Sequence, residues 1–249
     1  MYKGKKVIVV LPAYNAEKTL KKTYDDINKS LVDEIILVDD CSKDKTVELS
    51  RKLGITTIVH KKNLGYGGNQ KTCYKTALEK RADIVVMIHP DYQYDPKILE
   101  EMIFPIASRR CHAVFASRFL YPSDTLSGGM PVYKYIGNRI LTFIENLVLR
   151  VNLSEFHTGY RAWSKELLKD INFNANSNDF VFDTQMIIQV VNKKYRIREI
   201  PVETRYFGEA SSISLKRSII YGFSIFRELG KYLLTIWKIK KFKEYRNLN

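Results

Sequence analysis

Residues 83–96, DIVVMIHPDYQYDP, decide the fold class of this chain. The segment 83–88 is apolar and rich in β-branched residues, which is typical of a strand that is buried in a sheet. It runs directly into His89-Pro90-Asp91-Tyr92-Gln93, so a carboxylate and an amide follow the C-terminal end of the strand. Open α/β sheets bind their ligands at this end of the strands, and a carboxylate there indicates a hard cation and the phosphates that it holds.

Strand patterns recur on both sides of this segment and alternate with helical patterns. Further strands are expected at residues 6–11, 34–38, 56–60 and 112–117. The first helix between them has Ala16, Leu20, Tyr24 and Ile27 on one face, and others are expected at about 44–53 and 68–80. A fourth helix opens at Asp95 and Pro96, a recognised start of a helix. Strands that alternate with helices predict an α/β fold with a largely parallel sheet.

The second half of the chain is less regular. Gly128-Gly129-Met130-Pro131 interrupts the chain before a long helix expected at 132–150. A further helix is expected at 180–193, followed by a strand at 197–202. No internal repeat or low-complexity segment is visible. We therefore expect one compact domain over residues 1–214 and a helical appendage over residues 215–249.

The composition describes a globular protein with a large basic excess. Hydrophobic residues make up 45% and charged residues 27%, which allows a sizeable core. The net charge is +14, and half of it lies in residues 215–249, where nine Lys and Arg stand against Glu228 and Glu244. Such a charge alone would suit a nucleic-acid-binding protein. Because no recognised binding motif and no aromatic-lined basic platform is present, we expect no nucleic-acid partner.

The cysteines and the apolar runs indicate the cellular compartment of the protein. Cys41, Cys73 and Cys111 are widely spaced and form no CxxC or Cys/His pattern. They are expected to be reduced and mostly buried thiols, not a disulfide framework or a zinc site. The apolar run 7–11 is too short for a signal peptide, and no window approaches the roughly 18 apolar residues of a membrane span. We therefore expect a cytoplasmic protein.

Polar loops follow four of the expected strands. They are Pro12-Ala13-Tyr14-Asn15, Asp39-Asp40-Cys41-Ser42, the segment 63–69 and the segment 89–93. Because the C-terminal ends of parallel strands lie at one edge of a sheet, we expect the four loops to converge on a single site.

These loops, in this order, resemble the family-2 glycosyltransferases of the GT-A fold. The motifs are PAYN, VDDCSKD, NLGYGGN and a DxD-like loop, and the most similar branch is that of the polyprenyl-phosphate (dolichyl-phosphate) mannosyl- and glucosyltransferases. The resemblance covers about residues 5–215 and continues through Ala116-Ser117-Arg118-Phe119, Gly128-Gly129, Thr158-Gly159-Tyr160-Arg161-Ala162, Glu199-Ile200-Pro201-Val202 and Arg205-Tyr206-Phe207-Gly208-Glu209. It implies an inverting enzyme that moves a hexose from a UDP- or GDP-linked donor to a polyprenyl phosphate.

The resemblance assigns the nucleotide-sugar donor to the first loops. Asp39 matches the carboxylate that reads the base, and Asp40 matches its neighbour near the ribose. Glu17 stands one position later than the family's usual acidic residue. The loop that cradles the nucleotide corresponds to Pro12, Ala13, Tyr14 and Asn15.

Two of these loops also have simpler interpretations. Asp40, Ser42 and Asp44 could serve turn and helix-capping chemistry, which we favour for Ser42 and Asp44. Gly65, Gly67 and Gly68 could cradle a phosphate, but a tight turn that enters a helix is at least as good an interpretation.

The loop 89–93 resembles a DxDxQ-type metal site. Asp91 and Gln93 match the second aspartate and the glutamine, whereas His89 stands where the first aspartate is usual. Since Mg²⁺ or Mn²⁺ can be held by one or two carboxylates plus substrate phosphates, Asp91 could suffice. His89 would then be a nitrogen ligand better suited to Mn²⁺, a donor to phosphate, or a residue with no role. Pro90 belongs to the same donor-binding loop.

The remaining polar residues concern the leaving group and the acceptor. By resemblance, Arg205 neutralises the diphosphate, and Arg118 holds an acceptor phosphate. Lys134 and Asn138 take the places of two further phosphate contacts, unless they belong to a solvated helix face. A lipid phosphate needs no base, but a sugar hydroxyl does, and the candidate bases are then Asp179 and Asp183.

Three functions therefore remain open. The first is transfer to polyprenyl phosphate, the second is transfer to a saccharide of a surface glycan, and the third is a non-catalytic basic binding or scaffold protein. The appendage at residues 215–249 favours transfer to polyprenyl phosphate. Its apolar residues Ile219, Phe223, Phe226, Leu233 and Trp237 recur at helical spacing between basic residues. Such a helix is typical of an element that lies on an anionic membrane surface, unless it packs on the body of the protein. We expect a peripheral protein at the inner membrane face.

Overall fold

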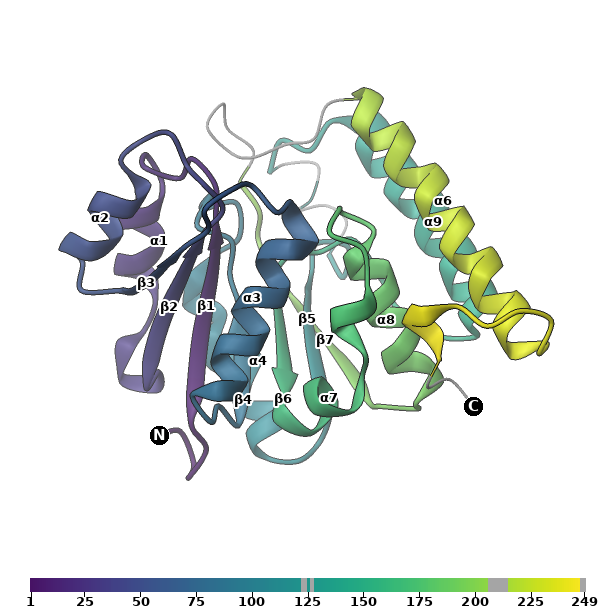
Figure 1. The fold of residues 1–249 in the computed structure, drawn as a ribbon, viewed down its shortest axis with the longest axis horizontal. Helices are drawn as coiled ribbons and strands as arrows, with labels where there is room; N and C mark the ends of the chain where they lie inside the picture. The colour runs from purple at the N-terminus through teal and green to yellow at the C-terminus, as the bar shows by residue number, and fades with distance from the viewer. Residues whose placement is uncertain (122–124, 126–127, 206–214, 247–249) are drawn as a thin grey trace.

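The computed structural model describes residues 1–121, 125, 128–205 and 215–246, with only the backbone of Leu215 and Lys216. Its centre is a seven-stranded sheet in the order β3-β2-β1-β4-β6-β5-β7 (Figure 1). The strands are β1 (Val7–Ala13), β2 (Glu34–Asp39), β3 (Thr56–Val59), β4 (Ile84–Met87), β5 (Ala113–Ser117), β6 (Arg161–Ser164) and β7 (Ile197–Pro201). The predicted α/β fold with a mostly parallel sheet is confirmed.

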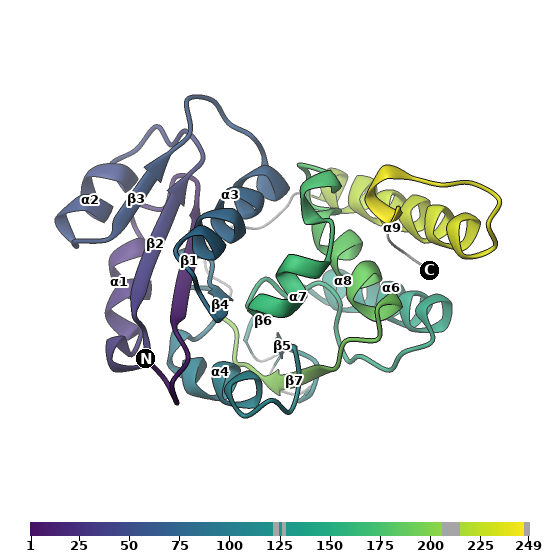
Figure 2. The ribbon, with the colours of Figure 1, turned by 60° about the horizontal axis from the view of Figure 1, so that its bottom comes forward.

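Helices cover both faces of this sheet (Figures 1 and 2). They are α1 (Leu20–Asp26), α2 (Thr46–Lys52), α3 (Tyr66–Glu79), α4 (Leu99–Ala107), α6 (Val132–Leu149), α7 (Lys165–Asp170), α8 (Phe182–Asn192) and α9 (Leu215–Ile236). Short 3₁₀ turns lie at Lys29–Leu31, Pro96–Ile98, Phe173–Ala175 and Lys243–Tyr245.

The core consists of two apolar layers, one on each face of the sheet. One layer packs α3, α7 and α8 against the strands through residues such as Tyr74, Leu167 and Phe182. The other layer packs α1 and α4 through residues such as Leu20 and Met102. Strand residues alternate between the two layers, as the two-residue period of a strand requires.

Strand β6 was not predicted, and it makes the sheet mixed. It pairs antiparallel with both β4 and β5, whereas β5 and β7 are parallel to each other. Its four residues read RAWS, and a charged residue at their start hides the strand pattern. The prediction was also wrong at the end of β1, because Pro12 and Ala13 are the last residues of the strand and not part of a loop.

The C-terminal helix α9 packs on the body of the protein. Its side chains Ile225, Leu229 and Tyr232 are buried in the same layer as α8. The carboxylate of Glu228 is completely buried and accepts hydrogen bonds from Gln185 of α8 (2.9 Å) and from the hydroxyl of Tyr245 (3.1 Å). The expected boundary at residue 214 lies outside the described residues. No helix among the described segments combines the length and apolarity needed to cross a bilayer.

The first turn of α3 has no room for a side chain at Gly67. A Cβ atom there would lie 2.5 Å from the carbonyl oxygen of Ser177 and 2.7 Å from Cβ of Phe182. We expect Gly67→Ala to lower the free energy of unfolding by about 1–3 kcal/mol, as overpacking usually does. Chemical denaturation measures it. Gly137→Ala is the control, because nothing lies within 4 Å of its Cβ position in α6. That change should be neutral or stabilising by up to about 1 kcal/mol.

Candidate functional site

The C-terminal ends of the strands bring the predicted loops to one edge of the sheet. Ala13 at the end of β1 pairs with Asp39 at the end of β2, and β4 is parallel to both. Since β4 and β5 are each antiparallel to β6, β5 and its parallel partner β7 also end at this edge. Arg118 follows β5 and Arg205 lies just beyond β7. The predicted convergence is therefore present, and strands β5 and β7 add two arginines to it.

The loop after β1 is tied to the loop after β2. The N–H of Asn15 donates to Oγ of Ser42 (2.8 Å), and the Asn15 side chain accepts from the N–H of Lys43 (2.8 Å). In the same way, Glu17 accepts from the N–H of Lys45 (3.1 Å), and its own N–H donates to Asp44 (3.0 Å). Asn15 and Glu17 thus hold the two loops together, and any contact of theirs with a nucleotide stays a prediction.

Exposure and turn chemistry distinguish the remaining residues of these loops. Tyr14 is 52% exposed, so its ring is open to a ligand. Asp44 accepts from the N–H of Thr46 (3.1 Å), two residues further on, which is the turn chemistry that we favoured for it.

Asp39 and Asp40 differ in what their carboxylates contact. Asp40 accepts from Nδ1 of His60 (2.8 Å) and from the N–H groups of Leu64 (2.8 Å) and Gly65 (2.9 Å), so it fixes the loop before α3. Asp39 is completely buried, and its Oδ2 accepts from the N–H of Ser42 (2.9 Å). Its Oδ1 has no hydrogen-bond partner among the described residues. An unpaired buried carboxylate oxygen is unfavourable, so a donor group of a ligand would be stabilised there.

The glycine loop forms a tight turn. Gly65 has φ of 83°, a conformation that favours glycine, and it precedes the first residue of α3. The N–H groups of Gly67 and Gly68 both donate to the carbonyl oxygen of Asn178, at 2.8 and 3.3 Å. These N–H groups are therefore engaged within the protein, and the donor-binding role expected for Gly68 stays a prediction.

His89 lies in a closely packed wall of the site. Its ring stacks on Tyr66, with centroids 5.4 Å apart, and a Cβ atom on Gly159 would lie 2.6 Å from its Cδ2. Burial lowers the pKa of His89, although the charges of Asp91 and Asp183 act in the opposite direction. The neutral ring is thus favoured at neutral pH.

The protonation of the His89 ring follows from Tyr66. The hydroxyl of Tyr66 donates its single proton to Asp183 (2.7 Å) and also lies 3.3 Å from Nε2 of His89. The histidine must then be the donor in that second contact. This arrangement leaves the lone pair on Nδ1, the nitrogen that could face a metal or a phosphate.

The rest of the loop 89–93 supplies one carboxylate. Asp91 accepts from the N–H of Gln93 (3.0 Å), and the carbonyl oxygen of Pro90 accepts from Thr19 (2.6 Å). In the described part of the chain no three His, Cys, Asp or Glu side chains gather as metal ligands. A single carboxylate suits Mg²⁺ or Mn²⁺ when substrate phosphates complete the coordination, so Asp91 fits the predicted ion in that manner.

Arg205 is held beside this loop. Its N–H donates to the carbonyl oxygen of Gln93 (3.0 Å), its guanidinium lies 4.8 Å from the ring centre of Tyr92, and Nη2 is 3.3 Å from Asp95. The buried Nη1 has no hydrogen-bond partner among the described residues. A cationic donor is therefore fixed beside the loop 89–93, and its role toward a diphosphate stays a prediction. The other residues of its motif, 206–209, lie outside the described residues.

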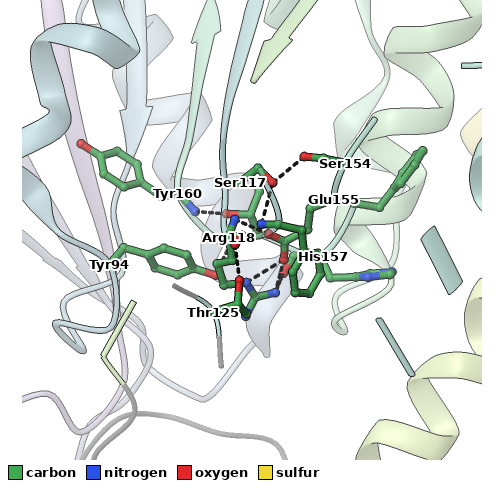
Figure 3. A network of polar contacts seen from close by, with 12 residues as sticks. Tyr94, Ser117, Arg118, Thr125, Ser154, Glu155, His157 and Tyr160 are labelled. Atoms are coloured by element: carbon green, nitrogen blue, oxygen red, sulfur yellow. Dashed lines mark hydrogen bonds and ion pairs between the residues drawn. The ribbon is translucent and has the colours of Figure 1, made fainter. Parts of the chain in front are cut away.

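Arg118 is buried in a polar network (Figure 3). Its side chain is 8% exposed, and it forms an ion pair with the completely buried Glu155. Nε donates to Oε1 of Glu155 (2.7 Å), and the backbone N–H donates to Oε2 (2.8 Å). The carbonyl oxygen of His157 accepts from Nη2 at 3.3 Å. Its role toward an acceptor phosphate stays a prediction.

Lys134 lies on the first turn of α6, within the electrostatic reach of Arg118. Burial and then the charge of Arg118 lower the pKa of Lys134. Asn138 is half-buried one turn further along the same helix. The positive charges of Lys134 and Arg118 repel each other, and binding of an anion near both would reduce this repulsion.

Comparison with known proteins identifies the family. The family model described as Glycosyl transferase family 2 matches residues 8–171. The chain belongs to glycosyl transferase family 2. It is 30% identical over 242 residues to the UDP-N-acetylglucosamine–dolichyl-phosphate N-acetylglucosaminyltransferase of Methanococcus voltae. This match covers 90% of the chain and 95% of the relative. It is also 26% identical to Glycosyltransferase AglD of Haloferax volcanii, over 94% of this chain and 37% of the relative.

A solved structure shares the fold of this family 2 chain. Glucosyl-3-phosphoglycerate synthase from Mycobacterium tuberculosis, in complex with Mn²⁺, UDP and phosphoglyceric acid, aligns with a TM-score of 0.71 at 19% identity. The alignment covers 96% of this chain and 80% of that chain. It confirms the GT-A fold that the resemblance predicted.

The two candidate bases of this family 2 protein occupy different environments. Asp183 forms an ion pair of 2.9 Å with Nη1 of the fully buried Arg161, and it also accepts from Tyr66 and from Gln70 (3.1 Å). Asp179 is exposed, and its Oδ1 accepts from the N–H of Phe180 (2.8 Å). Asp183 is thus held by three partners, and Asp179 stabilises the turn before α8.

No role was predicted for Arg161, Tyr66, Gln70 or Glu155. Arg161 opens a strand of four residues, all of which are buried. A charge inside a buried strand needs a partner, which predicts a carboxylate elsewhere in the core. Its identity as Asp183 could not be read from the sequence.

Proposed function

We propose that this family 2 protein is an inverting hexosyltransferase that uses a UDP- or GDP-linked sugar, with Mg²⁺ or Mn²⁺, and polyprenyl phosphate as acceptor. One observation carries the proposal. The edge of the sheet gathers Asp91, a buried unpaired oxygen on Asp39 and a buried unpaired nitrogen on Arg205. These are a ligand for a cation, an acceptor for a base N–H and a donor for a diphosphate.

The donor would extend along this edge. Asp39 accepts a hydrogen bond from the base, the ring of Tyr14 covers the nucleotide, and Arg205 neutralises the diphosphate. Asp91, with Gln93 and with Nδ1 of His89, would hold the cation. A bound Mg²⁺ or Mn²⁺ would offset the charge that develops on the leaving group.

The acceptor side is formed by Arg118, Lys134 and Asn138. A phosphate monoester is already anionic, so positive charge can place it without a base. Its oxygen forms a bond to the anomeric carbon from the face opposite the leaving group. The bond from that carbon to the diphosphate oxygen breaks with its electron pair, so the nucleoside diphosphate leaves and the configuration inverts. The name of the Methanococcus voltae relative, which specifies dolichyl phosphate, supports this acceptor class.

Transfer to a saccharide hydroxyl has weaker support. It requires a base, and the carboxylate of Asp183 is engaged by Arg161, Tyr66 and Gln70. A lipid-borne acceptor, in contrast, places the reaction at a membrane. We propose that the segment 215–249 contacts an anionic membrane surface, so that the protein acts at the cytoplasmic face.

Incubation of the purified protein with radiolabelled nucleotide sugars tests the proposed reaction. UDP-glucose, UDP-N-acetylglucosamine and GDP-mannose are each supplied with Mn²⁺, with and without undecaprenyl phosphate. Label that partitions into butanol only when both lipid and metal are present is the expected result. Transfer of label to a water-soluble saccharide, or no butanol-extractable label with any donor, would overturn the lipid-phosphate assignment.

Asp39→Asn is expected to weaken binding of the correct nucleoside diphosphate about 10- to 100-fold, because a hydrogen bond to a charged group is worth about 1.5–3 kcal/mol. Titration calorimetry with UDP and with GDP, each with Mn²⁺, measures the effect and identifies the base. Glu48→Gln is the control, since this carboxylate lies on the neighbouring helix α2 and forms an ion pair with Lys52 at the surface. Equal affinities of both variants would remove Asp39 from the base site.

A further inference from the structure

Helix α6 presents an apolar face to the solvent. Six large side chains at spacings of three and four residues are 51–69% exposed, namely Val132, Tyr133, Ile136, Ile140, Phe143 and Leu147. The opposite face of α6 is buried through Thr142, Glu145 and Leu149. An amphipathic helix normally directs its apolar face to the core, so this outward face needs a partner.

Helix α9 contacts α6 and repeats this arrangement. It buries Ile225, Leu229 and Tyr232, whereas the exposed apolar side chains on it and on the turn that follows are Ile219, Ile220, Phe223, Phe226, Ile236, Trp237 and Ile239. The two helices lie at the same end of the molecule, away from α1 and α2 (Figures 1 and 2). Because the two helices contact each other, their exposed apolar side chains gather at this end of the molecule. Most of the large apolar side chains exposed in the described part of the chain lie here.

Charge is segregated across these two helices. The acidic residues of 132–150 and 215–246 are Glu145, Glu228 and Glu244, and all three are at most 4% exposed. Basic residues of the same segments are exposed, among them Arg139, Arg227, Lys238, Lys240 and Lys241. Trp237 and Ile239 alternate with three of these lysines. The outward surface of the segments 132–150 and 217–246 is therefore apolar and cationic, with no exposed carboxylate.

We propose that α6 and α9 together form one docking face for an anionic lipid bilayer, which we call the two-helix face. Exposed apolar side chains would enter the interface, while Lys and Arg contact anionic head groups. A second copy of the same face is a poor partner, because it would bring cations against cations with no exposed carboxylate to pair with them.

The two-helix face extends the contact proposed for the C-terminal segment, since it adds α6. Only the link between this face and the lipid acceptor rests on the proposed function. Lys134 lies on the first turn of α6, beside the membrane-facing residues Val132, Tyr133 and Ile136. An acceptor that joins a phosphate to an apolar chain would thus find its cation and its lipid phase at the same helix end.

Co-sedimentation with vesicles tests the two-helix face without donor or acceptor. The vesicles consist of phosphatidylcholine with about 30% phosphatidylglycerol, and pure phosphatidylcholine serves as the neutral comparison. Wild type should bind the anionic vesicles and should be released as salt concentration rises. The α6 double variant Phe143→Ser/Leu147→Ser and the α9 double variant Phe223→Ser/Phe226→Ser should each bind at least about tenfold more weakly. Thermal unfolding verifies that both variants remain folded.

Val59→Ser is the matched control, because Val59 is 43% exposed on β3 and lies outside the two-helix face. This variant should bind like wild type. Unchanged binding by the α6 variant would overturn the proposal, and so would a wild-type dimer in light scattering that both double variants abolish. The butanol assay measures the transfer reaction and does not depend on vesicle binding. The two experiments therefore test membrane docking and the reaction separately.

Discussion

Asp91→Ala is expected to reduce the rate of hexose transfer by about 10³-fold or more, the scale of losing a principal electrostatic stabiliser of a leaving group. The effect should be large because Asp91 is the one carboxylate of the loop 89–93. A site with two metal-binding carboxylates would retain part of its affinity for the ion. Steady-state transfer measured over a range of Mn²⁺ concentrations should show that excess metal does not restore the rate.

Asp25→Ala is the control for Asp91, since this carboxylate on α1 is 49% exposed and, within the part of the chain that the structure describes, pairs only with Lys21 across one turn. It should transfer hexose at the wild-type rate. Binding of Mn²⁺ in the presence of UDP, followed by electron paramagnetic resonance, gives a second measure for both variants. If Asp91→Ala binds Mn²⁺ and transfers hexose as wild type does, the metal is held elsewhere or is not used.

Arg161→Met is expected to lower the free energy of unfolding by about 3–5 kcal/mol, because it leaves a buried carboxylate without its cation. Arg161 is completely buried, lies 2.9 Å from Asp183 and donates to the carbonyl oxygen of Phe156 (2.9 Å). Urea denaturation at neutral pH measures the loss. The double variant Arg161→Met/Asp183→Leu should recover much of it, since neither charge then remains in the core.

Lys52→Met provides the contrast to Arg161→Met. It breaks an ion pair with Glu48 in which the two side chains are 69% and 55% exposed, so the expected loss is below about 1 kcal/mol. A similar loss for Arg161→Met would mean that water or a neighbouring group neutralises Asp183. Failure of the double variant to recover stability would mean that Tyr66 and Gln70 depend on the Asp183 carboxylate for their own positions.

The sequence predicted those features that depend on local patterns. The strand 83–88 and the polar residues after it were found because a short apolar run and a turn are both visible in consecutive residues. The same holds for the start of the fourth helix, where Asp95 accepts from the N–H of Lys97 as an N-cap does. Once alternation had predicted a parallel sheet, the common edge for the loops followed from topology alone.

What the sequence did not reveal are pairings between distant residues. Arg118 was assigned to a phosphate, but its ion-pair partner Glu155 is 37 positions away and belongs to no recognisable pattern. The turn at Gly67 depends likewise on the carbonyl oxygens of 177 and 178, which come from another part of the chain. Strand β6 was missed because its sequence is too short and too polar to indicate a strand. The strand forms because it pairs with β4 and β5.

The buried carboxylate of Glu228 has a mechanical consequence. It joins α9 to α8 and to the residues that follow, and Lys231 bridges it to Glu244 at 2.8 and 2.7 Å. Lifting α9 from the body would break the hydrogen bond from Gln185 to Glu228 and would expose the apolar side chains of α9 that are buried in the core, so this helix is fixed to the body. A bilayer that α9 touches would then lie at a fixed height below the loops that follow β4 and β5. The reaction would then depend on how far the reactive group of an acceptor stands from the lipid surface.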